Sequence, residues 1–220
     1  MQELAPGLWR WTARHPEWHP GRWGAEVACF AVDAGEALLL VDPLLPAYDD
    51  GLLQRLDELA AGAPRVAILL TIPFHTRSAE PLSERFDASI YGHPRVADRL
   101  ERRKRFRAIG PADELPGSAR AYAIGTPRRY EMPIHLPSHR ALAWGDAVVT
   151  TLEGELRLWH WRDRVDAARV RWYRERFSPT LEPLLELDLE RILVTHGPPI
   201  LHDGAAALRT ALATAPWPGH

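Results

Sequence analysis

The segment LDLERILVTHGPPI, residues 187–200, is the most informative part of the sequence about the fold. Its run RILVT at 191–195 has the length and apolar content of a buried strand, and Gly197 with the two prolines that follow ends it. His196 is the first residue past that strand. A polar residue in this place is held rigidly at a sheet edge, which suits a metal ligand or a general base. The segment therefore predicts a functional residue at the end of a core strand.

Two earlier segments have the same arrangement of a buried strand followed by a polar loop. VAILLT at 66–71 leads into IPFHTRSAE, which places His75 and Arg77 in the loop before a helix. ALAW at 141–144 leads directly into Gly-Asp, with Asp146 as the polar residue. Because each loop is short and follows a buried run, we expect the three loop tips to share one sheet edge.

The other patterns predict alternating strands and helices, followed by a group of short strands. Two strands joined by a turn at 33–35 are expected within 26–42, the first exposed and the second buried, and a further strand at 88–91. Helices are expected at 51–62, 79–86, after Pro94, at 164–177, 180–186 and 203–214. Short strands are expected at 120–124, 132–136, 141–144, 147–151 and 156–161. This order favours an α/β layered fold in one domain, residues 1–220.

The composition excludes several classes of protein. With 46% hydrophobic and 25% charged residues, the 220-residue chain is neither disordered nor fibrous. A formal net charge of −2 argues against a protein that coats nucleic acid. The single cysteine, Cys29, excludes an internal disulfide and is expected to be a small core residue. No secretory signal and no long apolar stretch is visible, so we expect a cytoplasmic protein without membrane contact.

Four segments, taken in order, resemble the metallo-β-lactamase superfamily: LLLVDPLLP (38–46), AILLTIPFHTRSAE (67–80), AWGDAVV (143–149) and LDLERILVTHGPPI (187–200). The resemblance covers most of the chain from Val27 to Ile200. It implies a four-layer αββα sandwich with a metal site at the sheet edges. It also places Asp146 where the family has its bridging aspartate and His196 where it has its last histidine ligand.

The second of these segments departs from the family's HxHxDH motif. Where the family has its four ligands, this chain has Ile72, Phe74, Thr76 and Arg77. None of them is a ligand for a divalent metal: the first two have no lone pair, and arginine does not deprotonate. His75 lies one residue out of register. His139 precedes Asp146 by only seven residues, so the family's long hairpin before the aspartate is missing.

These departures leave two hypotheses about the site. In the first, the protein is a divergent hydrolase of small esters, thioesters or amides, with Asp146 and His75 as catalytic residues. One Zn²⁺ or other divalent ion would be held by Asp146, His196 and one or both of His75 and His139, because a catalytic zinc needs three protein ligands and an open position. The two-metal site of the family is not expected.

In the second hypothesis, the protein is a metal-free and non-catalytic relative that binds a small anionic ligand. The Arg77 guanidinium would occupy the place of the metal and pair with Asp146. The loop HPEWHPGRWG at 15–24 would cover the sheet edge, with Trp18 and Trp23 as pocket walls and its two histidines nearby. Asp42 is expected to have a structural role and to accept hydrogen bonds from the loop at 72–77.

A basic run at 99–107 supports a third and less favoured hypothesis. It contains five arginines and Lys104. Such a run is usually the solvated face of a helix, and a nucleic-acid contact is the alternative. Steep salt dependence of binding would identify that contact.

Overall fold

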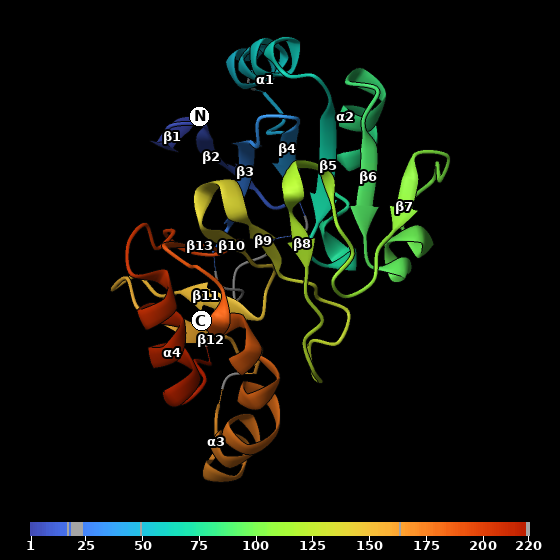
Figure 1. The fold of residues 1–220 in the computed structure, drawn as a ribbon. Coiled ribbons are helices and arrows are strands. Elements are labelled where there is room, and N and C mark those ends of the chain that lie inside the picture. Colours follow the sequence, from blue (N-terminus) through green and yellow to red (C-terminus); the bar gives the residue numbers. More distant parts are fainter. Residues whose placement is uncertain (17, 19–23, 49, 163, 219–220) are drawn as a thin grey trace.

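In the computed structural model, which describes every residue except 17, 19–23, 49, 163 and 219–220, two β-sheets pack face to face between helices (Figure 1). Three hydrophobic cores separate the layers. One lies between the sheets and includes Phe30, Leu39 and Leu193. The other two lie under the helices of each outer layer. The chain therefore has the predicted αββα sandwich.

The first sheet has seven strands in chain order. They are β1 (Gln2–Ala5), β2 (Leu8–Arg14), β3 (Glu26–Asp33), β4 (Leu38–Val41), β5 (Val66–Leu70), β6 (Ser89–Gly92) and β7 (Phe106–Ala108). The strands from β1 to β4 are antiparallel, and those from β4 to β7 are parallel. Parallel neighbours need crossover connections, and α1 (Asp50–Gly62) and α2 (Ala79–Arg85) supply the first two.

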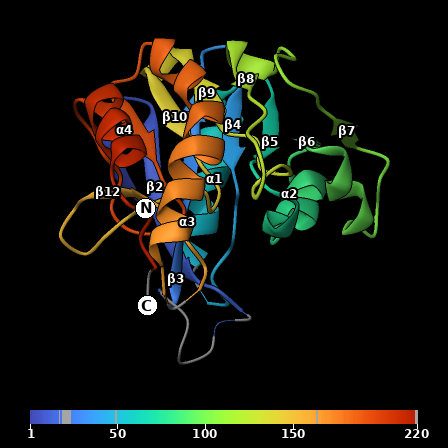
Figure 2. The same cartoon turned by 90° about the horizontal axis from the view of Figure 1, so that it is seen from below.

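The second sheet has the order β13-β10-β9-β8. Its strands are β8 (Arg120–Ala121), β9 (Ile134–Leu136), β10 (Ala141–Ala143) and β13 (Arg191–Leu193), and a separate hairpin joins β11 (Val148–Thr150) to β12 (Leu156–Leu158). The helices α3 (Ala167–Trp172) and α4 (Gly204–Ala213) lie on this side of the molecule, away from α2 (Figure 2). Because β10 and β13 are parallel, the residues that follow them reach the same sheet edge.

Most of the predicted elements are present, with different bounds. The helix at 51–62, the buried strand at 66–71 and the helix at 203–214 correspond to α1, β5 and α4. The segments at 94–98 and 182–186 form short 3₁₀ helices, and α3 begins only at Ala167, where Asp166 caps it through the Arg169 N–H. The two N-terminal strands were not predicted, because residues 2–14 mix arginine and tryptophan along a half-buried pattern.

One predicted environment and one predicted helix are wrong. The strand β3 is buried on both faces: Phe30 packs between the sheets, and Cys29 packs under the helices. Alternation therefore did not mark a solvent-exposed face there. Most of the basic run at 99–107 is exposed, as predicted, but the run forms a loop that leads into β7 and not a helix.

Candidate functional site

The loops that follow β4, β5, β10 and β13 bring Asp42, His75, Asp146 and His196 together. The Nε2 atom of His75 lies 3.4 Å from Oδ1 of Asp146, and Nε2 of His196 lies 3.6 Å from the same oxygen. The side chains of His75, Asp146 and His196 are 4%, 19% and 14% exposed. The predicted sharing of one sheet edge is confirmed, and the cluster opens to solvent through Asp146 and His196.

The Asp42 carboxylate fixes the orientation of the His75 ring through its contact with Nδ1. One of its oxygens accepts the Thr71 N–H at 2.9 Å, and the other accepts the Thr71 hydroxyl and lies 2.9 Å from Nδ1 of His75. Because a carboxylate only accepts hydrogen bonds, Nδ1 carries the hydrogen and Nε2 faces Asp146. Asp42 adopts a left-handed backbone conformation with φ of 46°, which aspartate tolerates better than most residues. The side chain of Asp42 thus positions His75, as expected of a structural residue.

The electrostatics of the cluster favour a charged His75. Burial and the nearby Arg77 lower the pKa of His75, but the carboxylates of Asp42 and Asp146 outweigh them and raise it. Burial alone would raise the pKa of Asp146, yet His75 and His196 hold it well below its usual range. The two carboxylates therefore favour the protonated form of His75 at this edge.

Glu131 is a site residue that the sequence did not reveal. It is fully buried, and its two oxygens accept the N–H groups of Gly145, Asp146 and Ala147. These contacts hold the loop that carries Asp146. The only signal for Glu131 in the sequence is an acidic residue directly before the apolar run at 132–136. Because β9 and β10 are antiparallel, β9 begins at the sheet edge where β10 ends, and this brings Glu131 to the Asp146 loop.

Arg77 lies at the edge but does not pair with Asp146 as predicted. Its Nη1 donates to the carbonyl oxygen of Asp42 at 3.1 Å. Within the described residues, no hydrogen bond or ion pair joins Arg77 to Asp146, and its buried Nε and Nη2 atoms have no oxygen acceptor. The backbone of Arg77 is left-handed, with φ of 37°, and its guanidinium lies close to the Cys29 thiol as well as to Asp42. The guanidinium is therefore beside the cluster and not in its centre.

His139 is the predicted ligand that the structure separates from the others. It precedes β10, whereas Asp146 follows that strand, so the two residues lie at opposite ends of it. The ring nitrogens of His139 lie 2.9 Å from the Ser138 hydroxyl and 3.2 Å from the Pro6 carbonyl oxygen. A role for His139 at the site is thus a wrong prediction.

The N-terminal loop reaches the edge at its described end. A side-chain carbon at Gly24 would lie 3.5 Å from Nδ1 of His196. The ring of Trp18 lies under the Arg14 guanidinium, 5.1 Å from ring centroid to carbon. Trp23 and His19 lie outside the described residues.

The residues present do not fit the two-metal centre that the resemblance implies. Across the described parts of the chain, no group of three or more His, Cys, Asp or Glu side chains is arranged to hold a metal ion. The substituted positions Ile72, Phe74 and Arg77 offer no ligand atom.

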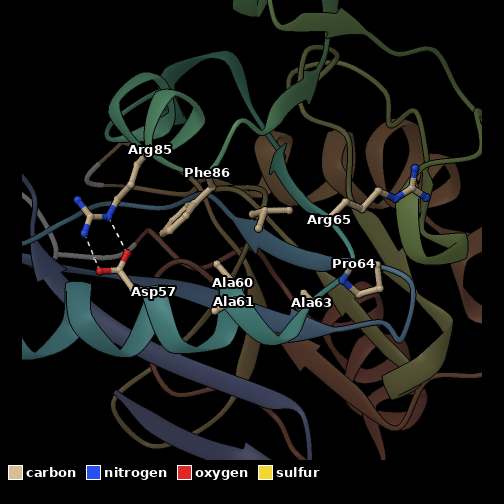
Figure 3. Close-up of a pocket in the computed structure, with 9 residues that line it drawn as sticks. Asp57, Ala60, Ala61, Ala63, Pro64, Arg65, Arg85 and Phe86 are labelled. Carbon is tan, nitrogen blue, oxygen red and sulfur yellow. Dashed lines mark hydrogen bonds and ion pairs between the residues drawn. The ribbon is translucent and has the colours of Figure 1, made fainter.

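A surface cavity of about 510 Å³ lies where β5 begins, at the opposite end of that strand from the loop that carries His75. Figure 3 shows the residues that line it. Small residues at the end of α1 line it, and Arg85 holds Asp57 through two hydrogen bonds of 2.6 Å on one side. None of the residues singled out in the sequence lines this cavity.

The chain has the metallo-β-lactamase fold. DIM-1 metallo-β-lactamase matches it with a TM-score of 0.64 and 14% identity, over 96% of this chain and 95% of that one. A metallo-β-lactamase from Erythrobacter litoralis gives 0.60 and 19%, over 96% and 89%. The metal-soaked Flv1 flavodiiron core from Synechocystis sp. PCC6803 gives 0.65 and 13%, over 95% and 58%.

At such identities the likeness establishes the fold alone, and the fold predicted from the four segments is confirmed. No protein-family model matches the chain, and no curated protein matches it in sequence. In the described part of the structure, every helix is too short or too polar to cross a bilayer.

Proposed function

We propose that the edge formed by His75, Arg77, Asp146 and His196 binds a small anionic molecule without a metal ion. One observation carries the proposal: the Nε and Nη2 atoms of Arg77 are buried and, among the described residues, have no oxygen acceptor, only the weakly accepting Cys29 thiol nearby. Leaving a buried donor unpaired costs about 1–3 kcal/mol. A carboxylate or phosphate would accept from both nitrogens at once.

The charges at the edge support a ligand of this kind. Arg77 offsets the carboxylates of Asp42 and Asp146, and the raised pKa of His75 favours a second positive charge, so the edge does not repel an anion as two bare carboxylates would. The donor chemistry agrees, because Arg77 stands at a motif position where the resemblance implies a metal ligand and cannot itself bind a cation. Trp18 and Trp23 remain candidate walls of the pocket.

The second candidate function is hydrolysis of a small ester, thioester or amide with one metal ion. The observation that favours it is that His75 and His196 both direct Nε2 at the same oxygen of Asp146, at 3.4 and 3.6 Å. These distances are those of ion pairs, and no group of three such side chains in the described residues is arranged to hold a metal ion, so this candidate requires the histidines to move. His139 takes no part in this candidate.

Metal content decides between the two candidates. Elemental analysis would be made on protein purified without chelator, and again after dialysis against zinc and manganese. We expect no retained ion in either sample. One ion per chain that is lost in His196→Ala would overturn the metal-free proposal and support the hydrolase.

Anion binding is tested at the histidines. In a sample with ¹⁵N-labelled histidine, we expect inorganic phosphate to move the side-chain signals of His75 and His196 in a saturable manner. Arg77→Gln should abolish the change, whereas Arg55→Gln, which removes an exposed guanidinium paired with Glu58 on α1, should not. Signals that stay fixed in the wild type, or that move equally in Arg77→Gln, would refute the proposal.

A further inference from the structure

We infer that Arg128, held between Trp159 and Trp161, forms a second anion subsite at the same edge, for a carboxylate or phosphate group. The inference rests on the proposed function in that the group belongs to the anionic ligand. The geometry of Arg128 is independent of Arg77, so the two sites can be tested separately.

The first observation is the pair of nitrogens that Arg128 leaves unused. Its Nε and Nη2 atoms are buried and have no hydrogen-bond partner in the described part of the chain. The same two nitrogens of Arg85 hold both oxygens of Asp57 at 2.6 Å. Those of Arg140 hold both oxygens of Asp188, at 2.7 and 2.8 Å. In this protein, that side of a guanidinium is thus the one that binds an anion in a two-pronged manner.

The second observation is the aromatic frame around the guanidinium. The Arg128 guanidinium carbon lies 5.1 Å from the ring centroid of Trp159 and 5.1 Å from that of Trp161. Such cation–π contacts fix the orientation of the group before a ligand arrives, which reduces the entropy lost on binding. The Nε1 atom of Trp159 is a further buried donor without a partner among the described residues. All three unpaired atoms are hydrogen-bond donors, so they select a ligand group that only accepts hydrogen bonds, such as a carboxylate or phosphate.

The third observation places this subsite beside the proposed pocket. The ring of Trp159 lies 5.9 Å from that of His196, centroid to centroid. Arg128 is close enough to Glu131 to oppose the effect of burial on the pKa of that carboxyl group. Glu131 does not pair with the Nε and Nη2 atoms of Arg128, because its oxygens accept the N–H groups around Asp146. Trp161 is 47% exposed, so the frame is open to solvent on that side.

The experiment follows the tryptophan indole signals by NMR in ¹⁵N-tryptophan-labelled full-length protein. Trp159→Phe and Trp161→Phe assign the two signals. Sodium acetate and inorganic phosphate are titrated separately at constant ionic strength, which distinguishes a carboxylate site from a phosphate site. We expect one or both anions to shift the Trp159 and Trp161 signals with a saturable curve.

Two variants of Arg128 and one matched control make the test specific. Arg128→Gln should abolish the shifts, and Arg128→Lys, which keeps the charge and loses the fork, should weaken binding at least tenfold. Arg129→Gln should leave the shifts unchanged, because the Arg129 side chain is exposed and contacts Tyr130. Arg128→Lys also covers the case in which the glutamine variant fails to fold.

The outcomes separate this inference from the proposed function. Tryptophan shifts that persist in Arg77→Gln while the histidine shifts disappear support two subsites. Tryptophan signals that stay fixed with both anions, or that move equally in Arg128→Lys, overturn the Arg128 subsite even if phosphate still moves His75. Fixed histidine signals with a working Arg128 subsite would refute the proposed function alone.

Discussion

Glu131 shows at the scale of one residue how a buried charge can organise a loop. Three backbone N–H groups at 145–147 point at its carboxyl group, and they anchor the segment that carries Asp146. Burial raises the pKa of Glu131 from 4.5 to about 7, against the opposing effects of Arg128 and of the N–H donors. The folded state therefore binds this proton more tightly than the unfolded chain.

This higher pKa predicts a dependence of stability on pH. The contribution of the Glu131 proton is complete below pH 4.5 and is lost as the pH rises through 7. Each tenfold difference in proton affinity corresponds to about 1.4 kcal/mol, so the loss is about 3 kcal/mol. Glu131→Gln cannot ionise. From pH 4.5 to pH 8 we expect the free energy of unfolding of the wild type to fall by about 3 kcal/mol more than that of the variant.

Urea unfolding followed by tryptophan fluorescence at several pH values measures this difference. The control is Glu58→Gln, since Glu58 is exposed on α1 and pairs with Arg55 at the surface. Parallel pH profiles for the wild type and Glu131→Gln would contradict the prediction.

At the scale of an element, the turn after β13 depends on Gly197. Its φ is 92°, and a side-chain carbon there would overlap the carbonyl oxygen of Thr150 at the end of β11. The Thr150 N–H also donates to the carbonyl oxygen of His196 at 3.0 Å. Glycine therefore lets the turn pack against the hairpin and fixes the position of His196.

Gly197→Ala is expected to destabilise the protein by about 3 kcal/mol or more. About 1–2 kcal/mol comes from the left-handed backbone, and the overlap with Thr150 adds about 1–3 kcal/mol. Gly154→Ala is the matched control: its φ is 86°, and no atom lies within 4 Å of the added carbon. That variant should lose only about 1 kcal/mol in urea unfolding. Equal losses in the two variants would show that packing against Thr150 contributes nothing.

At the scale of the whole molecule, the basic run at 99–107 is tied to the helical layer. Arg102 pairs with Glu84 and Arg105 pairs with Asp87, while the Glu80 carboxylate accepts the N–H groups of residues 101 and 102. These acidic partners, with a net charge of −2 for the chain, weaken the attraction to phosphate.

The protein is therefore expected to bind single-stranded RNA only weakly. For a labelled oligouridine of about 20 nucleotides, we expect a Kd weaker than about 1 µM at 0.15 M salt, as in non-specific binding. Fluorescence anisotropy at several salt concentrations measures it. Tighter binding with a log–log salt slope steeper than about −3 would restore the nucleic-acid hypothesis.

The fold could be predicted because its signals are local. The apolar runs at 38–41, 66–70 and 191–193 are strands in the structure, and the polar residue at the end of each lies at one edge. The bounds of short elements were less predictable, since 3₁₀ turns and short α-helices both place apolar residues three positions apart. The exposure of β3 was not predictable either, because two packed layers bury both of its faces.

Residue patterns are enough to predict the layered fold, the edge that holds His75, Asp146 and His196, and the loss of the family's ligands at Ile72 and Phe74. The partners of those side chains depend on the three-dimensional packing. It moved His139 to the far end of β10, turned Arg77 toward Asp42, and brought Glu131 under the Asp146 loop. Strand direction and register are set by pairing across the whole sheet, whereas residue patterns report only local burial.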